Sequence, residues 1–385
     1  MRDKDTIRIA VLLARKQLQL HRSLPGLHRF SREHPEVQFL SIHEEVGLDD
    51  LLAEGQIDGI LGHREVQHLP TLEAWGGPMV SILWGVGDGP MVIHDHGAIG
   101  RMAGSFLVER GFEDIGYTGD PSAAWSGMRR AGLQETALSA GRRVHLLQDQ
   151  PGMGPEVYAS RSGYIDAMVR WLGNQTFPFG LFCGLDSIGE FALEACVELG
   201  LRVPDDVAIL AATGDEWFSR FCDPPLTTVN TNLPEMAYEA AHWLLEIIQG
   251  RSTTSENLRV VPPIGITERA STDVFPYDDR AVARAMRFAR DHLSDSIGVD
   301  DLAAEAKVSA STLHRRFVAA TGLAPGAMLR RLRIDRARHR LVETDDSLLQ
   351  IALECGFGGA AQFSREFRKA VGTSPSQFRS DSLSP

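Results

Sequence analysis

The 385-residue sequence has little of what marks a secreted, membrane-bound or disulfide-stabilised protein. Its four cysteines lie far apart and form no CxxC pair, which argues against a disulfide framework and a structural zinc site, so we expect reduced, mostly buried thiols. No stretch approaches the roughly 18 apolar residues that a membrane helix requires, and the charged N-terminus lacks the apolar core of a signal peptide. These absences predict a cytoplasmic protein without membrane contact.

The motifs of common enzyme active sites are also missing, because the chain has no P-loop, no GxSxG elbow and no dinucleotide-binding glycine pattern. The string His94-Asp95-His96, or the pair His63 and His68, would be the candidates for metal or acid-base chemistry. Successive residues of a strand point to opposite faces, so His94 and His96 could lie on the same face of a strand, but Asp95 would then point to the opposite face. No further ligand at suitable spacing accompanies them. We therefore expect no enzyme, no catalytic residue, no metal and no cofactor.

Charge is divided unevenly along the chain. Residues 280–385 hold 17 Lys and Arg against 12 Asp and Glu, a net charge of +5, whereas residues 1–279 carry −17. Attraction to phosphate depends on local charge rather than on the total of −12. The C-terminal part is therefore where a polyanion would bind.

From residue 7 to about residue 263, short apolar runs alternate with longer segments of helical periodicity. This alternation predicts an α/β fold, with parallel sheets covered by helices on both faces and ligands at the carboxyl ends of the strands. The strand-length runs are residues 7–13, 37–42, 59–61, 78–82, 115–119, 143–147, 180–183 and 207–212.

A stretch rich in proline, glycine and small polar residues then interrupts the pattern and predicts a linker over residues 269–280. It separates a domain at residues 1–268 from a second domain at residues 281–385. The second domain is expected to be all-α, with helices at residues 281–292, 300–306, 311–320, 327–342, 348–354, 362–371 and 376–379.

Two parts of this helical domain are typical of helix-turn-helix units. In the first, a short helix and a three-residue turn lead to a helix with an outward face formed by Ser311, His314, Arg315 and Arg316. In the second, the helix and turn over residues 351–357 lead to an outward face formed by Gln362, Ser364, Arg365, Arg368 and Lys369. The arginine-rich helix between them could hold two recognition helices about one DNA turn, roughly 34 Å, apart. We interpret its arginines as packing stems, ion-pair partners or backbone contacts.

The strings Ile351-Ala352-x-x-Cys355-Gly356-Phe357, Phe363-Ser364-Arg365-x-Phe367-Arg368-Lys369 and Gly372-Thr373-Ser374-Pro375 resemble the DNA-binding domain of the arabinose-regulator (AraC) family. The resemblance implies base reading by Ser311, His314, Arg315, Gln362 and Arg365. Bidentate contact of arginine with guanine is the commonest specific pairing. Arg316 and Arg368 are better interpreted as solvated charges or phosphate contacts, which position the protein without reading sequence. Ala360 and Ala361 stand where many members carry polar side chains.

The first domain has a resemblance of its own. Val92-x-x-Asp95, Gly111-Phe112 with Ile115-x-Tyr117-x-Gly119, and Asp223-Pro224-Pro225-Leu226-Thr227-Thr228 are similar to the sensor domain of the lactose and galactose repressors, itself similar to periplasmic sugar-binding proteins. The resemblance spans about residues 7–268. It implies two lobes between which the chain crosses three times, and we expect the crossings near Asp120, Asn230 and Val260.

Sensor first and arabinose-type domain last is the order of the xylose-responsive regulators (XylR), and Trp125-Ser126-x-x-Arg129 and Val261-Pro262-Pro263-x-Gly265 match that group as well. The resemblance implies a transcription regulator, here expected to be an activator, with double-stranded DNA as its partner. It further implies a small sugar effector, xylose or a related monosaccharide. A homodimer is expected, with RNA polymerase as a further partner to consider.

A polyhydroxylated ligand needs carboxylates, a guanidinium and a flat aromatic face. Arg129 and Asp186 hold positions that resemble ligand contacts in such sensors, although Asp186 could instead cap the following helix. Asp95 lies at the carboxyl end of a strand, and Trp125 could belong to the cleft or to the core. The remaining ligand candidate is Asp215.

Two departures from the sugar-binding pattern stand beside these candidates. Thr213 occupies a position where many sugar-binding relatives carry an Asp, with Asp215 just beyond it. Residues 15–22 also lack the usual cleft sequence. The effector could therefore differ from xylose, or the site could have weakened.

The alternative from another functional class is a ligand-binding protein whose helical tail contacts other proteins without binding DNA. The basic tail and its two arginine-bearing faces argue against this alternative. Phosphate contacts would also give DNA binding a steep inverse dependence on salt, which a protein-binding tail would not show.

Overall fold

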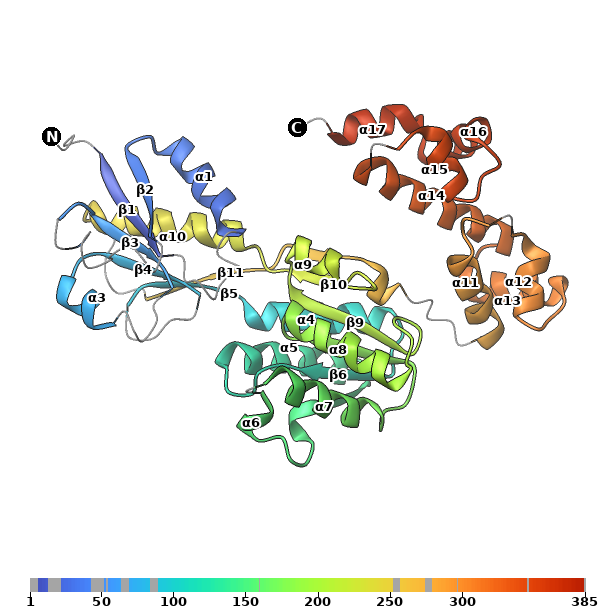
Figure 1. Cartoon of the computed structure of the whole chain (residues 1–385), viewed down its shortest axis with the longest axis horizontal. Coiled ribbons are helices and arrows are strands. Elements are labelled where there is room, and N and C mark those ends of the chain that lie inside the picture. Colours follow the sequence, from blue (N-terminus) through green and yellow to red (C-terminus); the bar gives the residue numbers. More distant parts are fainter. Residues whose placement is uncertain are drawn as a thin grey trace. The chain divides into compact units, whose positions relative to one another are not determined.

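The computed structural model describes residues 6–12, 22–42, 52, 55–63, 69–83, 89–158, 160–251, 257–273, 279–295, 297–344 and 346–383. The chain divides into two compact units, Met1–Val274 and Phe275–Pro385. The first unit combines strands and helices and the second is helical (Figure 1). Within the described residues, no helix is both long enough and apolar enough to cross a membrane.

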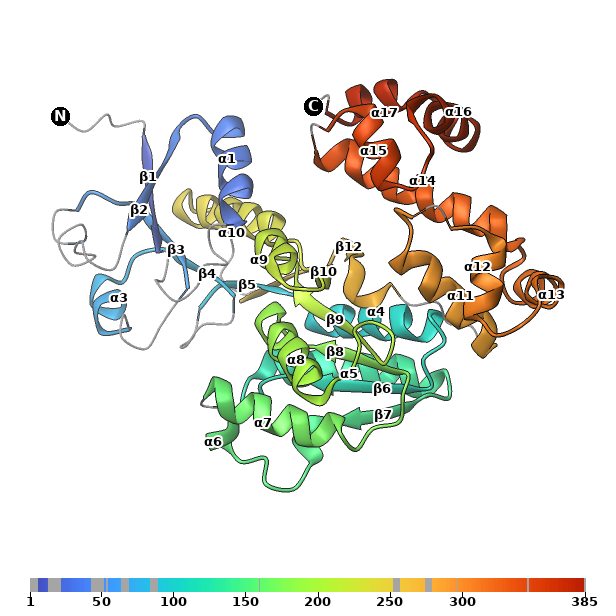
Figure 2. The same ribbon diagram turned by 45° about the vertical axis from the view of Figure 1, so that its right-hand side comes forward.

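Each of the two lobes of the first unit is built on one sheet of six strands (Figures 1 and 2). The first sheet is parallel throughout, in the order β11-β5-β4-β3-β1-β2. The second has the order β12-β10-β9-β8-β6-β7 and is parallel except for β12, which pairs antiparallel with β10. The strands of the first sheet are β1 (Ile7–Leu12), β2 (Val37–Ile42), β3 (Gly59–Gly62), β4 (Met79–Ile82), β5 (Met91–His94) and β11 (Leu258–Val261); those of the second are β6 (Asp114–Thr118), β7 (Arg143–Leu146), β8 (Phe179–Cys183), β9 (Val207–Thr213), β10 (Thr227–Asn230) and β12 (Gly265–Thr267).

Helices connect most of the parallel strands, as long crossover connections usually do. Central strands such as β8 and β9 are buried along their whole length, which explains why they appear in the sequence as continuous apolar runs. The predicted α/β fold of the first unit is therefore confirmed. The helical elements of this unit are α1 (Leu24–Glu33), α3 (Leu69–Trp75), α4 (His96–Glu109), α5 (Ala124–Ser139), η3 (Leu147–Asp149), α6 (Pro155–Tyr158), α7 (Arg161–Leu172), α8 (Asp186–Leu199), α9 (Glu216–Phe221), α10 (Leu233–Ile248) and η4 (Ala270–Thr272).

The chain passes between the lobes three times, but one passage is not where the sequence suggested. It crosses after β5 at Asp95, after β10 at Asn230, and between β11 and β12 after Val261. The predicted crossing near Asp120 is wrong, because β6 and β7 on either side of that residue pair with each other in the second sheet. Backbone hydrogen bonds join the true crossings, from the N–H of Asp95 to Val261 and from the N–H of Ile264 to Asn230.

The end of the first unit lies within the segment that the sequence suggested as a linker. Ser271 is fully buried, accepts a hydrogen bond from the backbone of Thr227 at 2.8 Å and donates one to the carbonyl of Ile209 at 2.6 Å. Thr272 is also buried, with its hydroxyl 2.7 Å from that of Thr227. Residues 269–273 are thus packed against β9 and β10.

Within its described residues, the second unit contains the seven helices that the sequence predicted. They are α11 (Arg280–Asp291), α12 (Val299–Glu305), α13 (Ala310–Thr321), α14 (Pro325–Glu343), α15 (Leu348–Glu354), α16 (Ala360–Val371) and α17 (Pro375–Leu383), the last longer than expected. One core packs α11, α12 and α13 against Met328 and Leu329 of α14. A second core packs α15 and α16 against Ile334, Ala337 and Leu341. The helix α14 therefore serves two helix-turn-helix units with separate cores.

The four cysteines are free and buried, as predicted. Burial raises the pKa of the thiol of Cys196 to about 12, which keeps this thiol protonated.

Candidate effector site and nucleic-acid interface

Close packing of α4 against α5 positions the first candidate, Arg129. A side chain at Gly100 would collide with the backbone carbonyl of Arg129, and one at Gly132 would collide with that of Gly97. Only glycine permits two helix backbones to approach so closely. As a result, Arg129 faces the first residue of α4, His96, and is almost completely buried.

Arg129 has two hydrogen-bond partners. Its Nε donates to Nδ1 of His96 at 3.2 Å, and its Nη1 donates to the carbonyl oxygen of Gly184, directly after β8. The guanidinium also lies over the ring of Trp125, 5.1 Å from its centre. Burial, followed by the charge of Arg129, lowers the pKa of His96 to about 2, so this imidazole is neutral and can accept the bond.

Asp186, the first residue of α8, forms a second centre beside Arg129. It accepts hydrogen bonds from the hydroxyls of Thr213 at 2.5 Å and Thr228 at 2.7 Å, and from the backbone N–H of Asp215 at 2.9 Å. Burial raises its pKa, and these bonds oppose the rise. The N-cap of α8 is Leu185, so the side chain of Asp186 ties together β9, β10 and the start of α9 instead of capping its own helix.

Asp95 and Asp215 are helix caps. Oδ1 of Asp95 accepts from the N–H of Ala98 at 2.7 Å at the start of α4, and Oδ1 of Asp215 accepts from that of Phe218 at 3.0 Å at the start of α9. Capping of this kind satisfies N–H groups that lack a partner within the helix. Among the described residues, the second oxygen of each carboxylate accepts no hydrogen bond.

The structure thus brings Trp125, Arg129, Asp186 and Asp215 together at the carboxyl ends of the second sheet, and places Asp95 at the adjoining crossing. It adds residues that the sequence analysis did not select as ligand contacts: Arg22 before α1, His94 at the end of β5, His96, Thr213 and Thr228. The sequence drew attention to the two histidines, but only as candidates for metal or acid-base chemistry. Most of the segment 15–22 lies outside the described residues, as does His68.

His94 and Arg22 bring the other lobe to this cluster. The rings of His94 and His96 are nearly perpendicular, with centres 5.8 Å apart. Burial, and next the charge of Arg129, lowers the pKa of His94 to about 3, and its buried Nδ1 has no hydrogen-bond partner. Burial lowers the pKa of Arg22, while the charges of Asp215 and Asp186 oppose this.

The nucleic-acid candidates occupy the solvent-facing sides of α13 and α16. Leu313 and Phe317 anchor α13, and Phe363 and Phe367 anchor α16, all four fully buried. The spacing of three and four residues leaves Ser311, His314, Arg315, Arg316, Gln362, Arg365 and Arg368 exposed, and Ser364 partly exposed. Arg316 pairs with Asp279 at 3.3 Å, and Oε1 of Gln362 accepts from the backbone of Gly358 at 3.0 Å.

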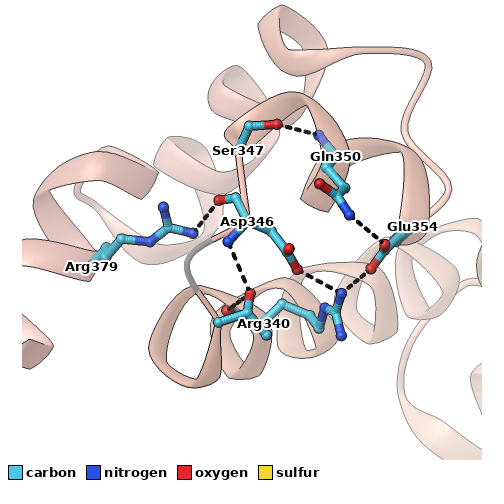
Figure 3. A network of polar contacts seen from close by, with 7 residues as sticks. Arg340, Asp346, Ser347, Gln350, Glu354 and Arg379 are labelled. Atoms are coloured by element: carbon cyan, nitrogen blue, oxygen red, sulfur yellow. Dashed lines mark hydrogen bonds and ion pairs between the residues drawn. The ribbon is translucent and has the colours of Figure 1, made fainter.

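Arg340 ties α14 to the second helix-turn-helix unit. Arg340 forms ion pairs with Asp346 at 2.7 Å and with Glu354 of α15 (Figure 3). Arg379 of α17 donates to the backbone carbonyl of Asp346 at 2.7 Å from the other side. The ion pairs of Arg340 agree with the interpretation of the α14 arginines as ion-pair partners.

Known proteins resemble both units. A model of the periplasmic binding protein-like domain matches residues 105–272, and a model of a helix-turn-helix domain matches residues 302–381. The xylose operon regulatory protein of Escherichia coli (strain K12) is 25% identical over 288 residues, 74% of this chain and 72% of that protein. The HTH-type transcriptional repressor PurR of Salmonella newport is 31% identical over 237 residues, 60% of this chain and 67% of that protein.

Among solved structures, that of the xylose-binding transcription activator xylR covers 98% of this chain and 99% of its own, with a TM-score of 0.76 and 22% identity. This likeness shows that the fold extends over both units in the same order. The chain therefore belongs with the transcription regulators that carry a periplasmic-binding-protein-like sensor, and it shares with the xylose operon regulatory proteins the order of that sensor before a helix-turn-helix domain.

Proposed function

We propose that this regulator binds specific double-stranded DNA through its helical unit under the control of a small sugar, a pentose such as xylose or a derivative of one. The observation that carries the proposal is the buried cluster around Arg129, which draws residues from both lobes to the carboxyl ends of the second sheet. Ligands of such folds bind at this edge. The other proteins named above are transcription regulators, which favours regulation over catalysis and does not favour a tail that ignores DNA.

Within the cluster we assign ligand contacts to Asp95, Trp125, Arg129, Asp186 and Asp215. The tryptophan ring offers a flat face for the C–H surface of a sugar. Asp95 and Asp215 each keep one carboxylate oxygen for a ligand hydroxyl, since helix capping occupies only the other. The hydroxyls of Thr213 and Thr228 already occupy part of the Asp186 carboxylate, so we assign this residue fewer contacts with the ligand.

On the DNA side we assign base reading to Ser311, His314 and Arg315 of α13, and to Gln362 and Arg365 of α16. Their exposure on helices with buried opposite faces supports this assignment. Arg316, Ser364 and Arg368 are assigned to the DNA backbone. Contact of Arg316 with phosphate would compete with its ion pair to Asp279.

We further propose a sensor domain at residues 1–268, a connecting segment at 269–280 and a DNA-binding domain at 281–385, acting in the cytoplasm as a homodimer. Effector binding would change the relation between the lobes and thereby the spacing of the DNA-binding domains in the dimer. Activation would then proceed through contact with RNA polymerase.

Replacement of Arg129 by Ala tests the control step. We expect loss of the effector response with basal DNA binding retained, as measured by fluorescence anisotropy with an operator duplex selected from random DNA. Loss of both through misfolding, visible in the melting curve, would count against the assignment. For the wild type, DNA affinity should fall steeply as salt rises, and protein that ignores duplex DNA even in dilute buffer would overturn the regulator function.

A further inference from the structure

Arg129 is a buried charge without a charged partner among the described residues. Its hydrogen-bond acceptors are a neutral imidazole and a backbone carbonyl. Nη2 makes no hydrogen bond to a described residue, and no described carboxylate forms an ion pair with the guanidinium. Removing an ion from water costs several kcal/mol unless an opposite charge or a set of hydrogen bonds replaces the solvent. Two neutral acceptors replace only part of it.

The nearby carboxylate, Asp186, is already largely occupied. Its Oδ2 accepts from both Thr213 and the N–H of Asp215, and its Oδ1 accepts from Thr228. A carboxylate offers about four acceptor positions, so roughly one remains. Asp186 therefore compensates the positive charge of Arg129 only from a distance. It also has little capacity to accept hydrogen bonds from several sugar hydroxyls.

Two further side chains of the other lobe face the cluster with open hydrogen-bonding positions, Arg22 and His94, the second of which also bonds to the backbone of Thr231. Arg22 makes no hydrogen bond or ion pair with a described residue, although it is partly buried and lies within electrostatic reach of Asp215 and Asp186. His94 is 5% exposed, and its Nδ1 has no hydrogen-bond partner. The cluster thus combines two guanidinium groups with open donor positions and one unsatisfied imidazole nitrogen.

From this arrangement we infer that the effector is a sugar acid, a polyhydroxylated chain or ring that carries a carboxylate, held by Arg129 and Arg22. The inference rests on the proposed function, because it refines the ligand class of the same site. A carboxylate supplies the missing charge and matches the planar fork of a guanidinium. Hydroxyl groups of the same molecule would reach the free oxygens of Asp95 and Asp215 and the Nδ1 of His94.

Within the described part of the chain, the end of β9 offers no free acceptor for a sugar hydroxyl. Thr213 is the last residue of β9, at a position where a carboxylate would accept hydrogen bonds from hydroxyls, and its own hydroxyl donates to Asp186. Replacing an acceptor by a group that is already engaged removes hydrogen bonds that a neutral sugar needs. The open donors are the guanidinium groups of Arg129 and Arg22, which favour an anion, whereas the free oxygens of Asp95 and Asp215 can accept from the hydroxyls of the same ligand.

Matched pairs of neutral sugar and sugar acid test the inference on the full-length protein. Xylose and xylonate form one pair and glucose and glucuronate the other, with acetate as a control for a simple anion. Titration calorimetry and the shift of the melting temperature report binding, because a ligand of the native state raises the melting temperature. We expect the acid of at least one pair to bind at least tenfold more tightly than its neutral partner and more tightly than acetate.

Two variants locate the carboxylate. Arg22→Gln should lower the affinity for the acid at least tenfold and that for the neutral sugar far less, because only the acid has a carboxylate to pair with the guanidinium. The variant should fold, since Arg22 makes no hydrogen bond or ion pair with a described residue. Arg129→Gln should abolish binding of the acid. Arg170→Gln, on the exposed side of α7, serves as the matched control and should bind like the wild type. If Arg129→Gln does not fold, Arg22→Gln still decides.

Each outcome separates the inference from the proposed function. If neither acid binds more tightly than its neutral sugar, while xylose or glucose changes the affinity for DNA, the sugar-acid inference is overturned and sugar control stands. An equal loss of acid and neutral sugar in Arg22→Gln would also overturn it. No response to either pair or to acetate, in protein that still binds operator DNA, would overturn the inference together with pentose control, but not DNA binding.

Discussion

Arg333 of α14 lies directly against Gly356, the residue that turns the chain between α15 and α16. A Cβ at Gly356 would stand 2.7 Å from Nε of Arg333 and would overlap the carbonyl oxygen of Leu293. The same guanidinium donates from Nη2 to the carbonyls of Asp295 at 2.9 Å and Ile297 at 3.3 Å, in the loop after α11. One arginine therefore joins the loop of the first helix-turn-helix unit to the turn of the second, which fixes the two units relative to each other.

Gly356→Ala should destabilise the helical unit by about 3 kcal/mol or more. The residue has a φ of +73°, which costs a side chain roughly 1 kcal/mol, and the added methyl group would also collide with backbone. Gly372→Ala is the matched control, because its φ is +89° but nothing lies near its Cβ, so we expect only the conformational part. Urea unfolding of both variants gives the comparison, and equal losses would contradict the junction.

Removing the charge at Arg340 should destabilise the second helix-turn-helix unit modestly. Arg340, Asp346 and Glu354 are each a quarter to a third exposed, so solvent screens the pairs and about 1 kcal/mol is expected for Arg340→Met. A double-mutant cycle with Glu354→Gln should yield a coupling of roughly half that value. Strictly additive losses would show that the ion pair between Arg340 and Glu354 in Figure 3 contributes nothing measurable to stability.

The buried histidines should make the sensor acid-sensitive. Their pKa values in the folded state, about 3 for His94 and about 2 for His96, lie below the value of 6.5 expected when unfolded. Below pH 6.5 the unfolded chain therefore binds protons that the native state does not, and stability falls as the pH drops toward 3. Each such histidine contributes a slope of about 1.4 kcal/mol per pH unit.

Unfolding free energies of the sensor at pH 6, 5 and 4 check this expectation. In His94→Asn, the unfolding free energy should fall less steeply with decreasing pH than in the wild type, by about 1.4 kcal/mol per pH unit. The carboxylates contribute equally to the pH dependence of both proteins. Identical slopes would mean that His94 is protonated in the native state.

Replacing Arg365 by Ala should cost about 1–3 kcal/mol of DNA binding and relax specificity at one base position, as expected for a side chain that reads a base. Arg368→Ala should instead weaken binding to all sequences alike and reduce the salt dependence, because it is assigned to phosphate. Binding to a set of operator duplexes with single substitutions distinguishes these patterns. A uniform loss in Arg365→Ala would move this residue to the backbone contacts.

Local sequence patterns were enough to predict most of the architecture. Apolar runs such as the one that forms β9 are buried on both faces, and their alternation with helical segments leads directly to parallel sheets. The helices of the second unit follow from caps and spacing, for example Ser309, whose hydroxyl accepts from the N–H of Thr312 at 3.2 Å. The edge strands β11 and β12 were not among the predicted runs, because they are short and partly exposed. The inner strands β5 and β10 were also not among those runs; they are largely buried but only four residues long.

Only the tertiary structure decided where the chain crosses between the lobes and which side chains meet there. The sequence around Asp95 and around Asp120 offers a strand followed by a helix in both cases, and sheet pairing alone distinguishes them. Arg22, His94 and Arg129 are far apart in the chain, and their proximity depends on how two sheets and the α4 and α5 backbones pack. Periodicity records which residues of one element are buried, whereas the partners of a buried charge are set by contacts between elements, which no local pattern encodes.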